Sequence, residues 1–149
     1  MATFKYIIEE NITLSNQVYK TMISKEIDSI DQFYRRVTTC TSGSQTTILN
    51  VASNNHANND GCLAHDDIKY IRITNLEITN SCEVAVVGNA TSYQFFLKAG
   101  ESHIIPSTNN SMLAEEDTSP SFGTMADIDK VIVKPESGDA NVEIVAVSV

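Results

Sequence analysis

Tryptophan is absent from this sequence of 149 residues, and lysine and arginine together number only ten. The absence of tryptophan weakens a carbohydrate-binding interpretation. The scarcity of basic residues, with a net charge of −9, argues against a nucleic-acid partner, because binding to a phosphate backbone depends on Lys and Arg. The same charge disfavours attachment to an anionic membrane. We therefore expect neither nucleic acid nor membrane as a partner.

Long hydrophobic runs are also missing. No apolar stretch approaches the roughly 20 residues that a membrane-spanning helix needs. The N-terminus becomes acidic at Glu9 and Glu10, which is too early for a signal peptide. We expect a chain that is made in the cytoplasm of its cell, and in that reducing setting the three cysteines are expected to be free thiols.

Motifs for catalysis and metal binding are weak. The sequence has no Gly-x-Ser-x-Gly elbow and no Ser-x-x-Lys, and the acidic run 115–117 reads as solvated loop rather than paired catalytic carboxylates. The best metal candidate is a polar segment that contains His56, Asp60, Cys62, His65, Asp66 and Asp67. It lacks a convincing fourth zinc ligand and the bidentate Glu of a calcium loop. We predict no metal, no cofactor and no catalytic residue.

What the sequence does contain is a series of short strands, rich in β-branched and aromatic residues, with Asn, Ser, Gly and Pro between them. In the second half these predicted strands are 68–73, 83–87, 93–97, 129–133 and 142–147. Their spacing of about ten residues is typical of a sandwich or barrel. Tyr93, Phe95 and Leu97 should form one core face, and His103 should be a packed or edge histidine.

The first half is harder to interpret. Residues 3–8 predict a strand or an extended arm, and residues 31–52 predict a hairpin with its turn at 41–45. Within 15–30, Tyr19, Ile23 and Ile27 recur every four residues, a spacing that fits a helix as well as a strand. We favour a short helix or turn over 25–30 and leave the rest of this stretch open.

The last predicted strand is apolar on both faces. Val142, Ile144 and Ala146 point one way, and Val145, Val147 and Val149 point the other. A strand with one face in water should alternate polar and apolar residues, so this strand should be covered twice. Its second cover is either a neighbouring subunit, which we favour, or the protein's own loops and N-terminal arm.

The succession of strands and turns from 71 to 145, including Phe95–Ser102, Ile104–Pro106 and Ile128–Val133, resembles that of small β-sandwich virion proteins of tailed bacteriophages, of the capsid decoration (cement) or head–tail accessory type. The resemblance covers about the last 80 residues. It implies a non-enzymatic structural protein of the virion, oligomeric and often trimeric, that contacts the major capsid protein or other virion proteins.

We therefore predict an all-β chain with a single-domain, jelly-roll-like β-sandwich of about eight strands over residues 31–149. Residues 1–30 form an extended N-terminal arm with at most one short helix. Its function is to decorate or cement a capsid as a homo-oligomer. The alternatives are a tail or head-fibre component, or a carbohydrate- or receptor-binding module. The predicted interface residues are Phe4, Tyr6 and Ile8 in the arm and Val145, Val147 and Val149 on the last strand.

Overall fold

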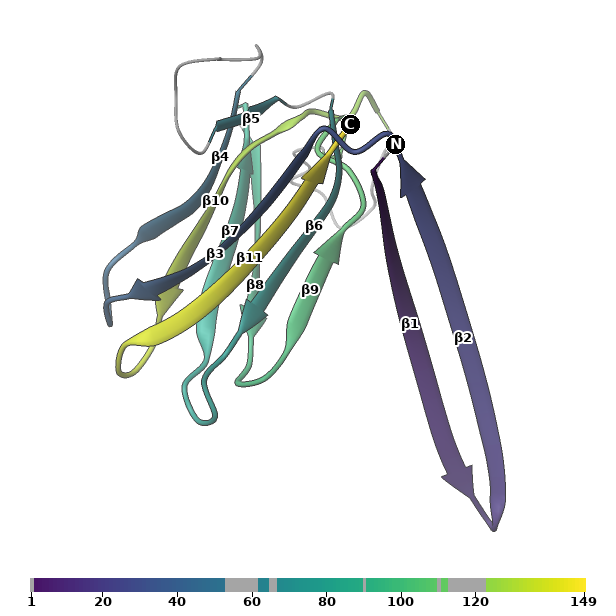
Figure 1. Cartoon of the computed structure of the whole chain (residues 1–149). Helices are drawn as coiled ribbons and strands as arrows, with labels where there is room; N and C mark the ends of the chain where they lie inside the picture. The colour runs from purple at the N-terminus through teal and green to yellow at the C-terminus, as the bar shows by residue number, and fades with distance from the viewer. Residues whose placement is uncertain (1, 53–61, 65–66, 90, 110, 113–122) are drawn as a thin grey trace.

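The computed structural model describes residues 2–52, 62–64, 67–89, 91–109, 111–112 and 123–149, and this part of the chain is all-β, with no helix. Eleven strands form a two-stranded, a five-stranded and a four-stranded sheet (Figure 1). The strands are β1 (Thr3–Leu14), β2 (Gln17–Asp28), β3 (Gln32–Cys40), β4 (Thr46–Ala52), β5 (Cys62–Ala64), β6 (Ile68–Asn75), β7 (Cys82–Gly88), β8 (Thr91–Leu97), β9 (Ser102–Ile105), β10 (Ile128–Pro135) and β11 (Ala140–Ser148).

The two larger sheets pack face to face as a sandwich, with strand orders β5-β4-β10-β7-β8 and β3-β11-β6-β9. Eight of these strands form nested antiparallel pairs: β3 with β11, β4 with β10, β6 with β9, and β7 with β8. When these four pairs fold over into two sheets, β11 comes to lie beside β6 and β10 beside β7. This is the strand arrangement of a jelly roll, so the predicted fold class is confirmed, with β5 as an additional strand.

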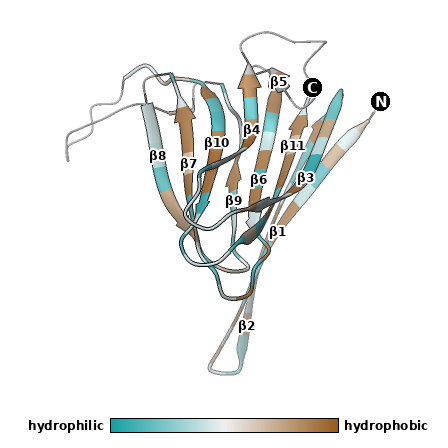
Figure 2. Ribbon diagram, turned by 90° about the vertical axis from the view of Figure 1, so that its left-hand side faces the viewer, coloured by the Kyte–Doolittle hydropathy of each residue, from teal (hydrophilic) through white to brown (hydrophobic). Residues whose placement is uncertain are grey.

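The core lies between the inner faces of the two sheets. Strand β7 illustrates why these sequences form strands, because Cys82, Val84 and Val86 are fully buried while the residues between them are only partly buried. A period of two is what a strand needs to turn one set of side chains inward. Figure 2 shows the same alternation of hydrophobic and hydrophilic residues along the strands of the sandwich.

The N-terminal region is a long antiparallel hairpin, in which each strand has 12 residues. Its two-residue turn is made by Ser15 and Asn16, whose φ angles are 50° and 63°. Two successive positive φ values match a type I′ turn, which suits the twist of the flanking strands. Of the helix or turn expected over 25–30, the helix is wrong, since β2 continues to Asp28. The chain does bend within this range, at Ser29, where φ is 60°.

The segment 31–52 contains two strands, as expected, but they do not form the predicted hairpin. β3 pairs with β11 in one sheet, whereas β4 pairs with β10 and β5 in the other. The turn at Thr41–Gln45 therefore carries the chain from one sheet to the other. A turn sequence indicates a reversal, but it does not state whether the next strand joins the same sheet or the opposed one.

Both faces of β11 are covered, and both covers belong to the same chain. Val142, Ile144 and Ala146 lie in the sandwich core, while Val145 and Val147 lie in a second cluster with Ile27 and Tyr70. Partly buried side chains from the base of the hairpin complete that cluster, namely Phe4, Tyr6 and Ile30. The two-faced pattern was interpreted correctly, but the inference that a neighbouring subunit covers the second face is wrong. The N-terminal hairpin covers it.

Candidate interaction surface

The hairpin of β1 and β2 projects from the sandwich, and we call residues 3–28 the arm (Figure 1). Backbone hydrogen bonds fix its base: Ile30 N–H donates to Ala2 C=O over 3.0 Å, and Asp31 N–H donates to Ser148 C=O over 3.0 Å. At about 3.3 Å per residue, each 12-residue strand is about 40 Å long. Only the first part of this length lies against the sandwich.

One face of the arm is largely apolar. In the antiparallel register, Phe4 lies opposite Ile27, Ile8 opposite Ile23, and Ile12 opposite Tyr19. Side chains two residues apart share a face, so these pairs form one continuous stripe with Tyr6, Glu10 and Leu14. The other face is mostly polar and charged, with the exposed ion pair of Lys20 and Glu9 at 2.9 Å, and it also carries the apolar residues Ile7, Val18 and Met22.

The stripe begins in the second hydrophobic cluster and ends in solvent. Phe4 and Ile27 pack against the sandwich, but the side chains beyond them are progressively uncovered. Ile8 is 38% exposed, and Ile12 and Leu14 are 62% and 65% exposed. We call residues 9–22 the arm end. A two-stranded hairpin without a packed face is marginally stable in water, so this apolar stripe points to a contact with another surface.

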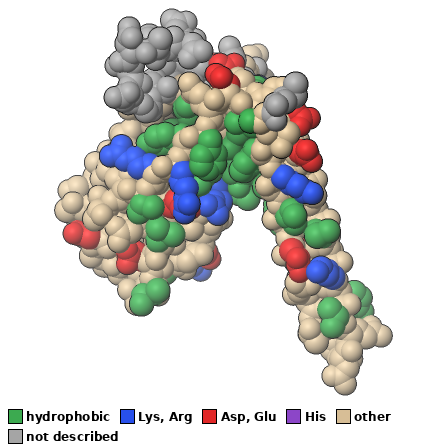
Figure 3. Space-filling view, viewed as in Figure 1, with side chains coloured by type: hydrophobic (Ala, Val, Ile, Leu, Met, Phe, Trp, Pro, Cys, Tyr) green, Lys and Arg blue, Asp and Glu red, His purple; other side chains and the backbone are tan. Residues whose placement is uncertain are grey.

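A groove of about 520 Å³ lies between the arm and the outer face of the four-stranded sheet. Aromatic rings line its upper part, since Tyr6 and Phe4 lie 4.8 Å and 5.0 Å from Tyr70 between ring centroids. Figure 3 shows hydrophobic side chains gathered where the arm meets the sandwich, with Lys and Arg side chains beside them. The remaining lining residues are Ile7, Ile8, Phe33, Arg35, Arg72, Ile104 and Val145.

Two arginines share one carboxylate in the floor of this groove. Arg35 donates through Nε to Glu143 Oε1 over 2.7 Å, and Arg72 Nη2 lies 2.5 Å from Oε2 of the same carboxylate. Glu143 is almost buried, whereas the Arg35 side chain is 63% exposed. Two guanidinium groups against one carboxylate leave a local excess of one positive charge in a chain whose net charge is −9.

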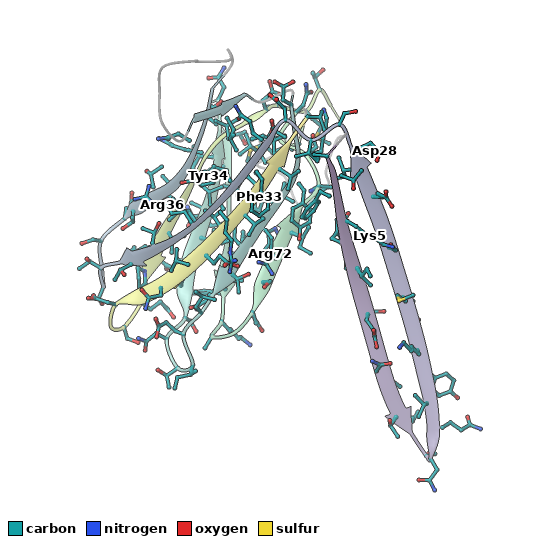
Figure 4. All side chains as sticks on the ribbon, in the orientation of Figure 1. Lys5, Asp28, Phe33, Tyr34, Arg36 and Arg72 are labelled. Atoms are coloured by element: carbon teal, nitrogen blue, oxygen red, sulfur yellow. The ribbon has the colours of Figure 1, made fainter. Side chains whose placement is uncertain are left out.

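The outer face next to these arginines is partly apolar. Every second residue of β3 points to this outer face, which places Phe33, Arg35 and Val37 in one row. Phe33 and Val37 are 59% and 51% exposed. Tyr34 points the other way and packs against the sandwich core. Figure 4 shows Phe33 and Arg72 on the side of the sheet that faces the arm. Beyond the base of the arm, the outer face therefore exposes an apolar–basic–apolar row.

The structure brings the predicted interface residues together. Phe4, Tyr6, Val145, Val147 and Val149 all belong to the second cluster, and Ile8 lines the adjoining groove. Five of the six thus belong to one cluster within one chain. Sequence reasoning missed Tyr70 and the Arg35–Glu143–Arg72 group. A lone acidic residue in an apolar strand was the available signal, but its two partners come from different strands and could be found only from the fold.

The other sequence candidates have structural roles or lie outside the described residues. His103 is half-buried on the edge strand β9, its ring 4.1 Å from that of Phe95, and burial lowers its pKa below the usual value. Tyr93 and Phe95 face the core with Leu97, as predicted. Tyr70 is buried, and its ring packs against those of Phe4 and Tyr6 at the base of the arm.

The cysteines and the metal candidate can be placed in part. Cys40 and Cys82 are buried free thiols, as predicted, and burial raises the pKa of Cys82 to about 11. Of the metal candidate, His56, Asp60, His65 and Asp66 lie outside the described residues. Among the residues that are described, no group of three or more His, Cys, Asp or Glu side chains could hold a metal ion.

Comparison with known proteins adds no identity: no family model, no curated protein and no solved structure matches the chain. The described part of the structure also contains no helix that is long and apolar enough to cross a membrane.

Proposed function

We propose that this protein is a non-enzymatic structural component of a bacteriophage virion that decorates or cements the capsid through protein–protein contacts. Its partners in this proposal are the major capsid protein or other virion proteins, together with further copies of itself. The resemblance of the sequence favours three copies. No cofactor, nucleic acid or membrane takes part.

The observation that carries the proposal is the arm, whose apolar stripe continues beyond the sandwich into solvent. Ile12, Leu14 and Tyr19 contribute nothing to the core of this chain, since each is more than half exposed. A projecting element with an uncovered apolar face is suited to hold a neighbouring polypeptide. The base of the arm packs on the jelly-roll body, and a net charge of −9 discourages non-specific contact with packaged DNA.

The proposal is tested on purified particles of the phage whose genome encodes the chain. Mass spectrometry of these particles should find the chain in many copies, and particles that lack it should bind the purified protein in a co-sedimentation assay. Chain that is absent from particles and fails to bind capsids would rule out the proposed function. A matched variant, with residues 9–22 replaced by an Asn-Gly turn, should bind more weakly because the arm end is missing.

A tail or head-fibre component is the alternative within the same class, and fractionation of the particles into heads and tails separates the two. The carbohydrate- or receptor-binding alternative predicts binding to one sugar class on a glycan array. The proposal for the capsid predicts no such binding.

A further inference from the structure

The arm end and the outer face of the sandwich are complementary in both hydrophobicity and charge. Along one face of β1, Ile8, Glu10 and Ile12 alternate as apolar, acidic, apolar. Along the outer face of β3, Phe33, Arg35 and Val37 alternate as apolar, basic, apolar. Both rows have the two-residue period of a strand, so their members are spaced equally, about 6.7 Å apart.

From this complementarity we infer that the arm end of one copy of this chain lies against the outer face of a second copy, with Glu10 facing Arg35. The inference deepens the proposed function by naming the nearest partner in the assembly, and it rests on that function. It places Ile8 and Ile12 against the exposed apolar residues Phe33 and Val37. It also brings a carboxylate to the arginine pair that Glu143 balances only in part.

The charge argument favours a second copy over an unrelated partner. Glu10 is the one charged residue on the apolar face of the arm end, because its neighbours on that face are Ile12, Leu14, Tyr19 and Thr21. An isolated carboxylate in an apolar stripe opposes burial unless a cation meets it. The Arg35 side chain is 63% exposed, and a guanidinium has five N–H donors. The contact with Glu143 uses Arg35 Nε and Nη2.

The size of the contact also fits. A ribbon of two strands is about 10 Å wide, and the stretch from Ile8 to Leu14 extends about 23 Å, so a reciprocal exchange of two arm ends covers on the order of 1,000 Å² in total. That value is near the lower limit for specific interfaces. The arm end does not reach the outer face of its own sandwich. Ile30 and Asp31 hold the base of the arm in place, and beyond this base the arm diverges from the sandwich (Figure 1).

The test is a charge-reversal mixing experiment on the full chain, read by light scattering. Wild-type protein should have a mass of at least two chains. E10R and R35E should each weaken association by about tenfold or more, because each places like charges against each other across the contact. Mixing the two variants should restore the mass. The basic arm of E10R then meets the acidic outer face of R35E, and the native arm of R35E meets the native outer face of E10R.

A second pair of variants tests the apolar contacts of the arm end. I12R and V37E change two exposed positions, 62% and 51% exposed, and Val37 lies opposite Glu143 in the register of β3 and β11, so the folding of V37E is checked separately. Each alone should be monomeric, and their mixture should associate. Circular dichroism melts of all four variants verify folding.

Three results would overturn the inference. Wild-type chain that remains monomeric up to millimolar concentration contradicts it, as do reversal variants that associate as strongly as wild type. A mixture of E10R and R35E that does not regain the mass of the wild type contradicts it too, because Glu10 and Arg35 would then not meet across a contact between two chains. None of these outcomes bears on whether the chain is found in particles, so failure here and failure of the proposed function are distinguishable.

Discussion

At the scale of single residues, Glu143 determines the electrostatics of the outer face. Its almost buried carboxylate holds Arg35 and Arg72 side by side. Two guanidinium groups that contact the same carboxylate are close enough to repel each other, and the anion between them offsets this repulsion. The chain therefore uses one acidic residue on an apolar strand to keep two cations on the surface.

We expect Glu143→Gln to lower the free energy of unfolding by about 1–3 kcal/mol, the usual effect of removing a hydrogen-bonded charge from a partly buried site. Urea denaturation of both proteins at neutral pH measures the difference. Glu83→Gln is the matched control, because Glu83 pairs with Lys134 at 2.9 Å on an exposed surface, where ion pairs contribute little. Equal effects of the two substitutions would contradict the central role of Glu143.

His103 makes the stability depend on pH in the acidic range. Burial lowers its pKa below the usual 6.5, so the folded state resists protonation more than the unfolded state does. The stabilisation is complete above the usual pKa and is lost as the pH falls through the lowered value. The free energy of unfolding should therefore decrease as the pH falls below about 6.5, and His103→Phe should lose that part of the slope. An unchanged slope in the variant would assign the pH dependence to other groups.

Residue patterns predicted the core well and the pairings poorly. Val142, Ile144 and Ala146 were assigned to one core face, and Tyr93, Phe95 and Leu97 to another, because a period of two can be recognised within a single strand. The partners of Glu143 could not be predicted in the same way. They lie 108 and 71 residues away in sequence, and only the jelly-roll order places them on either side of β11.

At the scale of elements, the arm is divided into a base that packs and an end that does not. Tyr6 at the base contacts Tyr70 through its ring, whereas Ile12 in the arm end is 62% exposed. Both side chains lie on the same face of β1. Their different surroundings arise from their distance along the arm rather than from their chemistry.

We predict that Tyr6→Ala lowers the free energy of unfolding by about 1–3 kcal/mol, because it removes a half-buried aromatic ring from the second cluster. Ile12→Ala should change it by no more than a few tenths of a kcal/mol. Thermal denaturation of dilute protein compares the two variants without a contribution from association. A large loss of stability in the Ile12 variant would mean that the arm end packs within the same chain.

The ambiguity of the segment 15–30 had a physical origin. Tyr19, Ile23 and Ile27 are four residues apart, and four residues return a side chain to the same face of a strand and nearly to the same face of a helix. The turn residues Ser15 and Asn16 held the missing signal. Both adopt the positive φ values of a hairpin turn.

At the scale of the whole molecule, the chain combines a sandwich, one outer face of which the base of the arm covers, with a projecting arm end. Because the second face of β11 is covered, that face no longer gives a reason to expect a partner. The uncovered arm end gives a different reason to expect one. Sequence analysis therefore inferred an intermolecular contact from a face of β11 that the chain itself covers. It could not distinguish the two surfaces, because the arm residues that cover β11 and those that remain exposed belong to the same apolar stripe.

We propose that the arm end holds a neighbouring polypeptide. Sedimentation equilibrium of the full chain, beside a variant with residues 9–22 replaced by an Asn-Gly turn, is the measurement that decides this. We expect the full chain to associate and the shortened variant to be a monomer, with the same melting temperature as the full chain in dilute solution. Full chain that stays monomeric at every concentration, or a shortened variant that associates as strongly, would refute the proposed role of the arm end.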